Sequence, residues 1–290
     1  PQQFRGIKPK LVVREGDKVK TGSPLFFDKL KPEVKWASPS SGVVTSIHFG
    51  ARRIIEKIEI SVEDKKPESY KSFSSSELNA ADREAVMKNI LDACIFPLIR
   101  QRPFNKVANP NDVPRDIFVS AYNTAPLSVN VSKVIQNNKD QFQAGLTALS
   151  KLTGGSVYLS SQKPMEFDNV TNVTIEGPHP AGNVGIQIHH IKPINPGEVI
   201  WTVNAQHVIT IGKLFQNGQY DPGCIVSIGG SGSSNPQTVR ALTGSSIGSL
   251  LKDQLLNGSQ RIISGDVLTG KRVSSDDYLG FYDSSVAIIN

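Results

Sequence analysis

The chain has 290 residues, enough for two or three domains of ordinary size. Its composition, with 38% hydrophobic and 20% charged residues, is that of a soluble globular protein and excludes disordered and fibrous classes. Two cysteines exclude a disulfide scaffold and an iron–sulfur cluster held by four cysteines of this chain. No run approaches the ~20 consecutive apolar residues of a membrane-spanning helix.

The excess of positive charge lies near the N-terminus. Residues 1–70 carry 14 basic and 9 acidic side chains, a net charge of +5, whereas residues 225–290 carry 5 of each. A basic domain can bind nucleic acid, an anionic membrane surface or an acidic partner. Acidic residues interrupt its lysines and no aromatic-plus-arginine stripe is present, which argues against nucleic acid. Solvated surface lysines are the plainer interpretation.

Residues 13–47 have the rhythm of short strands separated by turns. Gly-polar pairs at 16–17 and 22–23 predict turns, and the apolar residues between them suit strands that point inward. This rhythm resembles the biotinyl/lipoyl-type barrel-sandwich domains, whose attachment lysine lies ten residues after the second glycine. Pro32 occupies that position here. The segment therefore predicts the carrier fold without its modified lysine.

A charged, serine-rich stretch from residue 63 to residue 76 predicts a linker, so the first domain is expected over residues 1–66. Asp82 is a predicted helix N-cap, and short strands then alternate with helices, the pattern of parallel βαβ units. The expected strands are 117–122, 157–160, 173–176 and 199–203, and the expected helices are 139–152 and 206–215. We expect a Rossmann-like parallel α/β domain over residues 67–224.

A third module is expected over residues 225–290, after a Pro-Gly pair at 222–223. Its predicted elements are strands at 225–228, 261–263 and 286–289 and a helix near 246–255. The chain begins without methionine and ends inside an apolar, strand-like run, so we expect it to be truncated at both ends, with the third module incomplete.

Three motifs are weak on inspection. The G-x-S-x-G pattern at 244–248 resembles the nucleophile elbow of serine hydrolases, but no histidine follows it, so Ser245 is interpreted as a helix N-cap. The glycines at 230 and 232 lack the third glycine of a dinucleotide-binding loop. The histidines lack the spacing and carboxylate neighbours of a metal site.

Two clusters remain as a candidate site. Residues 177–182, GPHPAG, form a proline-fixed loop between a predicted strand and helix, where α/β sheets bind ligands. Residues 100–106, RQRPFNK, combine arginines, which bond carboxylate, phosphate or quinone oxygens, with an aromatic ring. An exposed basic loop is the plainer interpretation of the second cluster. The candidate residues are Arg100, Arg102, Phe104, Lys106, Gly177, His179 and Gly182.

Several long motifs, taken together, resemble one family. They are VREGDKVKTGSPLFFDK, RPFNK, GPHPAGN, IWTVNAQHVITIGKLF, IVSIGGS and RIISGDVLTG, and they span nearly all of the chain. The sequence is similar to the A subunits of bacterial sodium-translocating NADH:quinone oxidoreductases. Compared with that family, some 40 residues are missing before Pro1 and a C-terminal region is absent after Asn290.

The resemblance implies a barrel-sandwich hybrid domain, an α/β domain like that of the NADH-binding subunit of complex I, and a β-grasp-like module of the soluble-ligand-binding (SLBB) type. It implies a peripheral subunit on the cytoplasmic side of the inner membrane, in a complex that oxidises NADH, reduces ubiquinone and exports Na⁺. Its partners would be the other subunits and quinone. The family lacks the flavin and iron–sulfur ligands of complex I, so no cofactor is expected in this chain, and the candidate residues would bind quinone or a partner subunit.

Two alternatives stay open. A carrier protein would bear biotin or lipoate on Lys29 or Lys31, the lysines nearest to Pro32. The C subunit of the Rnf electron-transport complex shares the architecture but carries iron–sulfur cysteines, which disfavours it here.

Overall fold

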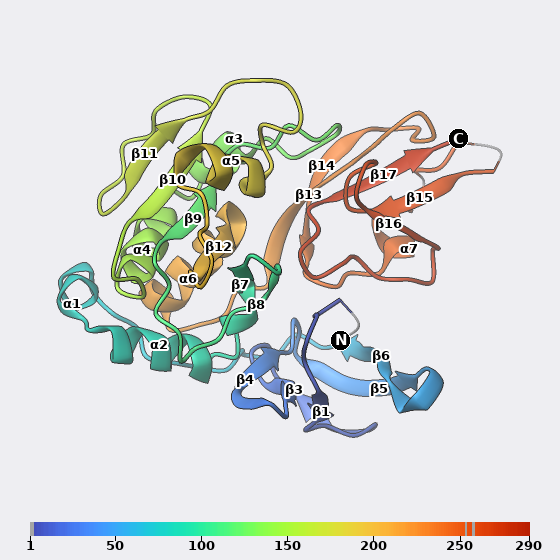
Figure 1. The fold of residues 1–290 in the computed structure, drawn as a ribbon. Helices are drawn as coiled ribbons and strands as arrows, with labels where there is room; N and C mark the ends of the chain where they lie inside the picture. The colour runs from blue at the N-terminus through green and yellow to red at the C-terminus, as the bar shows by residue number, and fades with distance from the viewer. Residues whose placement is uncertain (1–2, 253, 257–258) are drawn as a thin grey trace.

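A computed structural model describes residues 3–252, 254–256 and 259–290. Its strands form four sheets, and the strands of the first two interleave along the chain. Two three-stranded sheets come from the N-terminal part, a six-stranded sheet lies in the middle, and a five-stranded sheet forms the C-terminal part (Figure 1).

The two N-terminal sheets are antiparallel and share one core. One contains β1 (Pro9–Leu11), β3 (Pro24–Asp28) and β4 (Lys31–Ala37), and the other contains β2 (Lys18–Val19), β5 (Gly42–Phe49) and β6 (Ile55–Val62), with the short turn η1 (Ala51–Arg53) between the last two. Val19, Leu25, Val34 and Val44 are buried among them. Each comes from a different strand, which explains the spaced apolar residues of this segment.

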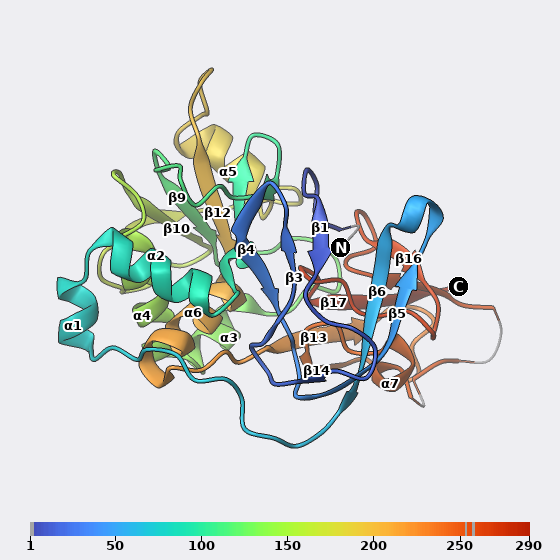
Figure 2. The ribbon, with the colours of Figure 1, turned by 90° about the horizontal axis from the view of Figure 1, so that it is seen from below.

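The segment from residue 63 to residue 74 runs along the surface from β6 to α1 (Ser75–Ala80) (Figure 2). Its backbone is tied down at both ends: Glu68 N donates to Thr21 O at 2.9 Å, and Phe73 N donates to Phe215 O at 2.7 Å. The segment therefore bonds to both of the parts that it connects. Ser74 then forms a capping box with Glu77 and begins α1, a helix that we did not predict.

The six-stranded sheet has the order β11-β10-β9-β12-β7-β8. The first four are parallel, and the last two are antiparallel additions. The elements are α2 (Arg83–Asp92), η2 (Phe96–Leu98), β7 (Ile99–Arg102), β8 (Lys106–Val107), β9 (Ile117–Ser120), α3 (Val131–Gln136), α4 (Lys139–Ser150), β10 (Val157–Ser161), β11 (Thr171–Thr174), α5 (Val184–Ile191), β12 (Ile200–Asn204) and α6 (Ala205–Asn217). Asp82 caps α2 as predicted, accepting from Ala85 N.

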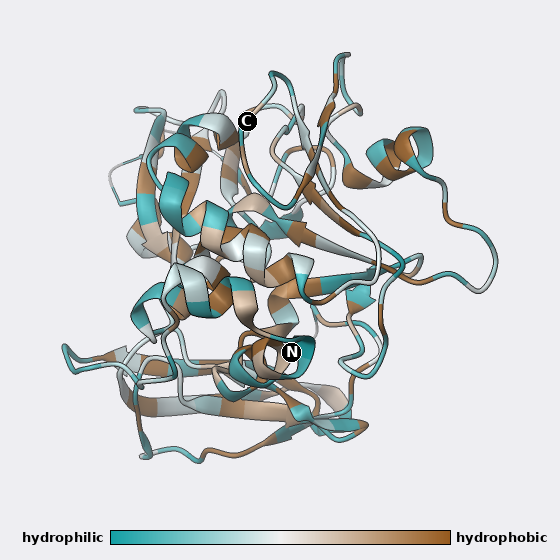
Figure 3. Cartoon of the chain, turned by 90° about the vertical axis from the view of Figure 1, so that its left-hand side faces the viewer, coloured by the Kyte–Doolittle hydropathy of each residue, from teal (hydrophilic) through white to brown (hydrophobic). Residues whose placement is uncertain are grey.

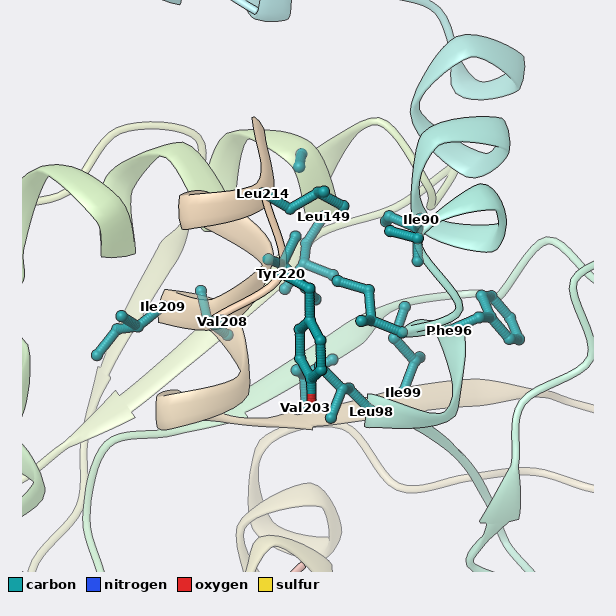
Figure 4. Close-up of a cluster of buried hydrophobic side chains, with 14 of the residues drawn as sticks. Ile90, Phe96, Leu98, Ile99, Leu149, Val203, Val208, Ile209, Leu214 and Tyr220 are labelled. Carbon is teal, nitrogen blue, oxygen red and sulfur yellow. The ribbon is translucent and has the colours of Figure 1, made fainter. Parts of the chain in front are cut away.

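Helices cover both faces of this sheet. The core of Figure 4 lies on the face covered by α4 and α6, where Leu149 lies beside Leu214 and Val203 lies near Leu98. On the other face α5 packs against β9, and Ile188 meets Phe118. Figure 3 shows apolar and polar residues side by side on the helices, as expected for helices with one buried face. Burial on both faces explains the nearly continuous apolar runs of the central strands.

The five-stranded sheet has its own core. Its elements are β13 (Gly223–Gly229), β14 (Gln237–Leu242), α7 (Ile247–Leu250), β15 (Arg261–Ser264), β16 (Lys271–Val273) and β17 (Ser285–Ile289), in the order β14-β13-β17-β15-β16. Two predictions were wrong here. The helix expected near 246–255 ends at Leu250, and its N-cap is Ser246, which accepts from Ser249 N, and not Ser245. Ser245 instead closes the preceding turn by accepting from Leu242 N.

Candidate functional site

The GPHPAG loop follows β11 and leads into α5, at the carboxyl edge of the parallel strands. β9 and β12 end at the same edge, with Ser120 and Asn204 as paired last residues. Ligands of open α/β sheets bind at this edge because the loops that leave neighbouring strands meet there. The fold therefore gives the loop the position that its sequence predicts.

Thr124, from the loop after β9, holds the GPHPAG loop in place. Its hydroxyl accepts from Gly182 N at 2.9 Å and lies 3.2 Å from His179 Nδ1. A Cβ on Gly182 would lie 2.4 Å from Thr124 N, so only glycine fits. Gly177 has a φ of +134°, which also favours glycine, and its carbonyl accepts from the Tyr122 hydroxyl at 3.4 Å. Nothing in the sequence singled out Thr124.

Gln187, in α5, connects the loop to the sheet. Its Nε2 donates to Ser120 Oγ at 3.0 Å and to Ala181 O at 3.2 Å, while its Oε1 is buried without a hydrogen-bond partner. Buried polar atoms normally have partners, so unpaired ones mark places where water or a ligand can bond. Other such atoms come from strands of this sheet: Arg102 Nε, Ser160 Oγ and Thr202 Oγ1.

Arg102 belongs with the loop. Its Nη1 lies 3.8 Å from the position that a Cβ on Gly185 would take, in the first turn of α5. No described residue forms an ion pair with it. Burial lowers the pKa of Arg102, and the nearby Arg100 lowers it further. A guanidinium so placed, beside a loop rich in glycine, can donate to an oxygen of a ligand.

The other three candidate residues lie elsewhere. Arg100 stands 4.5 Å from the Tyr282 ring, in a cavity outside the loop. Phe104, at the tip between β7 and β8, is 73% exposed. Lys106 lies near Lys31, whose pKa is lowered by burial and by the charge of Lys106. The structure thus holds Gly177, His179 and Gly182 in one loop, places Arg102 at the first turn of the helix that follows it, and separates the rest.

The described residues contain no group of three His, Cys, Asp or Glu side chains arranged for a metal ion. Burial raises the pKa of the Cys94 and Cys224 thiols to about 11, so both are protonated at neutral pH. Across the described parts of the chain, no helix has the length and apolar character required to cross a bilayer.

Family models match the chain in three consecutive stretches. Residues 1–63 match the NqrA N-terminal barrel-sandwich hybrid domain, residues 81–220 the NqrA second alpha/beta domain, and residues 225–275 the NQRA C-terminal domain. The chain belongs to the NqrA family. The expected barrel-sandwich, α/β and SLBB domains are therefore present.

Full-length NqrA relatives are similar along the whole chain. It is 38% identical to the A subunit of the Na(+)-translocating NADH-quinone reductase of Saccharophagus degradans, over 99% of the chain and 65% of that protein. The corresponding protein of Marinomonas sp. is 37% identical, and that of Vibrio alginolyticus is 35% identical, each over 99% of the chain. The chain thus spans about two thirds of these relatives. Neither the carrier nor the Rnf alternative is favoured by these matches.

A crystal structure of an NAD+-reducing [NiFe]-hydrogenase in the air-oxidized state shares the fold more distantly. Its TM-score is 0.50 with 12% sequence identity, over 72% of this chain and 47% of the hydrogenase chain. At that identity the likeness concerns the fold alone.

Proposed function

We propose that the chain acts as a peripheral subunit of a Na⁺-translocating NADH:quinone reductase. The observation that carries this proposal is the match to NqrA relatives over 99% of the chain. In such a complex NADH is oxidised, two electrons and two protons convert ubiquinone to quinol, and Na⁺ is exported. Other subunits would be the partners of this chain and hold the redox centres, and the chain alone would catalyse nothing.

We propose domain boundaries at residues 1–66, 67–224 and 225–290, with a Rossmann-like middle domain and a β-grasp-like third one. Four parallel strands with helices on both faces support the first label. A sheet of mainly antiparallel strands with one short helix supports the second. The first domain, with its net charge of +5 over residues 1–70, suits docking on the cytoplasmic side of the membrane through partner subunits.

We propose that the GPHPAG loop and Arg102 receive the quinone headgroup. The Arg102 guanidinium has no ion-pair partner among the described residues and can donate to a quinone carbonyl oxygen. His179 is fixed beside Thr124 and can bond the second oxygen. Phe104, Arg100 and Lys106 are the remaining predicted residues. They lie on the same hairpin as Arg102 but away from the loop, so the headgroup bonds proposed here do not use them. A segment of a partner subunit in this place is the competing occupant.

A photoreactive ubiquinone analogue on the assembled complex tests the site. We expect labelled peptides from residues 177–182, and Arg102→Gln and His179→Ala should reduce labelling at least about tenfold, the effect of a lost bond to a charged donor. His190→Ala, on the exposed side of α5, is the matched control. If the analogue labelled only other subunits, the chain would not bind quinone at this loop. If both variants left the labelling unchanged but prevented assembly of the complex, this surface would belong to a partner subunit instead.

A further inference from the structure

A cavity lies where three distant parts of the chain meet. Its volume is about 190 Å³, and its walls come from the N-terminal segment, from the β7–β8 hairpin and from the loop before β17. Figure 1 shows that hairpin between the N-terminal sheets and the C-terminal sheet. Arg5 and Arg100 line the cavity, and its described lining includes no aspartate or glutamate. It is therefore positively charged, and it lies apart from the GPHPAG loop.

Within the described parts of the chain, the Arg100 guanidinium has no acceptor. None of the described residues forms a hydrogen bond or ion pair with it, and its closest partner is the face of the Tyr282 ring at 4.5 Å. The nearby carboxyl of Asp283 accepts instead from Ser264 Oγ at 2.7 Å, and burial raises the pKa of Asp283. A half-buried guanidinium without an acceptor is costly, so a bound anion would stabilise it.

Asn105 requires a hydrogen-bond donor from the ligand, whereas the arginines require acceptors. Its Oδ1 is buried and has no hydrogen-bond partner among the described residues, and its backbone has a left-handed φ of +49° in the turn between β7 and β8. A ligand that satisfies this carbonyl oxygen must donate a hydrogen bond, while the arginines need acceptors. An ionised carboxylate only accepts. A hydrogen phosphate keeps both its negative charge and a hydroxyl.

The walls are fixed by contacts outside the cavity. The Tyr282 hydroxyl donates to Pro97 O at 2.8 Å, and the ring of Phe4 lies 5.9 Å from that of Tyr282. Gln3 Oε1 accepts from Phe281 N at 2.8 Å, which joins the N-terminal segment to the loop before β17. The walls that carry the arginines are therefore held together before any ligand arrives.

We propose that this cavity binds a phosphoryl group, as free phosphate or as a phosphate monoester. The phosphoryl oxygens accept from Arg5 and Arg100, and a protonated oxygen donates to Asn105 Oδ1. A cavity of ~150 Å³ holds benzene, so the volume here leaves room for a small substituent beside the phosphoryl group. The inference stands apart from the proposed function, since it uses neither His179 nor Arg102, and the proposed headgroup bonds do not use Arg100.

Calorimetric titration of inorganic phosphate into the full chain, at constant ionic strength, tests the proposal. We expect saturable binding, and Arg100→Gln and Arg5→Gln should each weaken it at least about tenfold, as for a lost charge-assisted hydrogen bond. Arg5 is exposed, so its variant tests the site even if Arg100→Gln impairs folding. Arg272→Gln, on an exposed residue of β16, changes the net charge equally and should bind like the parent.

Glycerol 3-phosphate and phosphatidate vesicles separate the sources of the phosphoryl group. Tighter binding of glycerol 3-phosphate than of phosphate would identify a monoester, and vesicle binding that Arg100→Gln abolishes would identify a lipid headgroup. Absence of phosphate binding, equal binding of acetate, or equal weakening in Arg272→Gln would overturn the proposal.

Discussion

The hydroxyl of Tyr278 donates to the Glu59 carboxylate at 2.8 Å, a bond between residues 219 positions apart. The same carboxylate pairs with Lys57 at 2.8 Å and with His48 at 3.1 Å. It thereby joins the N-terminal sheet to the C-terminal part of the chain. Lys57, then His48 and Tyr278, lower the pKa of Glu59 to about 2.

Tyr278→Phe should therefore lower the free energy of unfolding by about 0.5–1 kcal/mol, the value of one partly exposed hydrogen bond. Because the folded pKa of Glu59 is depressed from 4.5 to about 2, its contribution is complete above pH 4.5 and is lost as the pH falls through about 2. Denaturant unfolding of Glu59→Gln should show a constant deficit above pH 5 that shrinks toward pH 2. A deficit independent of pH would show that the charge contributes nothing.

His207 should stay neutral in the folded protein. Burial lowers its pKa to about 3, and the charge of Arg100 adds to this effect. Between pH 6.5 and about 3 only the unfolded chain binds the proton, so stability should fall with falling pH by up to ~1.4 kcal/mol per unit. His207→Gln should remove that slope relative to the parent, as measured by denaturant unfolding. An NMR titration that protonates His207 near pH 6 would contradict the assignment.

Gly212→Ala should destabilise the fold although alanine favours helices. A Cβ there would lie 1.7 Å from Gln141 O, where α6 crosses α4. The helices would have to separate, at a cost of about 2–3 kcal/mol that exceeds the ~1 kcal/mol gained in helix propensity. Gly154→Ala, with nothing within 4 Å of its Cβ, is the control and should change stability by less than about 0.5 kcal/mol. Thermal unfolding of both variants would show the difference.

No prosthetic group should be attached to Lys29 or Lys31. Lys29 lies exposed in the turn between β3 and β4, where an attachment enzyme could reach it, so the test is a direct one. The intact mass of protein expressed together with biotin and lipoate ligases should equal the mass of the sequence, whereas a carrier domain in the same cells gains its group. An adduct mapped to either lysine would revive the carrier interpretation.

The central strands could be predicted because burial on two faces leaves a strong apolar signal. Trp201 and Val203 face one layer of helices and Ile200 faces the other, so β12 reads as a continuous apolar run. β7 was missed because it contains Arg100 and Arg102, which are typical of a loop. It is a strand because its backbone pairs with β12, with Gln101 opposite Trp201, and no local pattern contains that information.

The candidate site was predictable in part for the same reason. The glycines and prolines of the GPHPAG loop form a local motif, so the sequence alone points to them. Thr124 lies 55 positions before His179 and meets it only once β9 and β11 are in place. Arg100 and Arg102 point to the same side of one strand, yet their side chains reach different surroundings. Adjacency in sequence therefore does not place two side chains in the same surroundings.

The bond from Gln3 to Phe281 and the bond from Tyr282 to Pro97 fasten one short loop to the N-terminal segment and to the α/β domain. A cut near residue 224 would leave the rings of Phe281 and Tyr282 without their neighbours, and it would leave Arg100 facing water. The C-terminal sheet is thus a separate unit in sequence and topology, but its stability is coupled to that of the rest of the chain. Exchange of this sheet for another module would also remove the wall of the Arg100 cavity that Tyr282 provides.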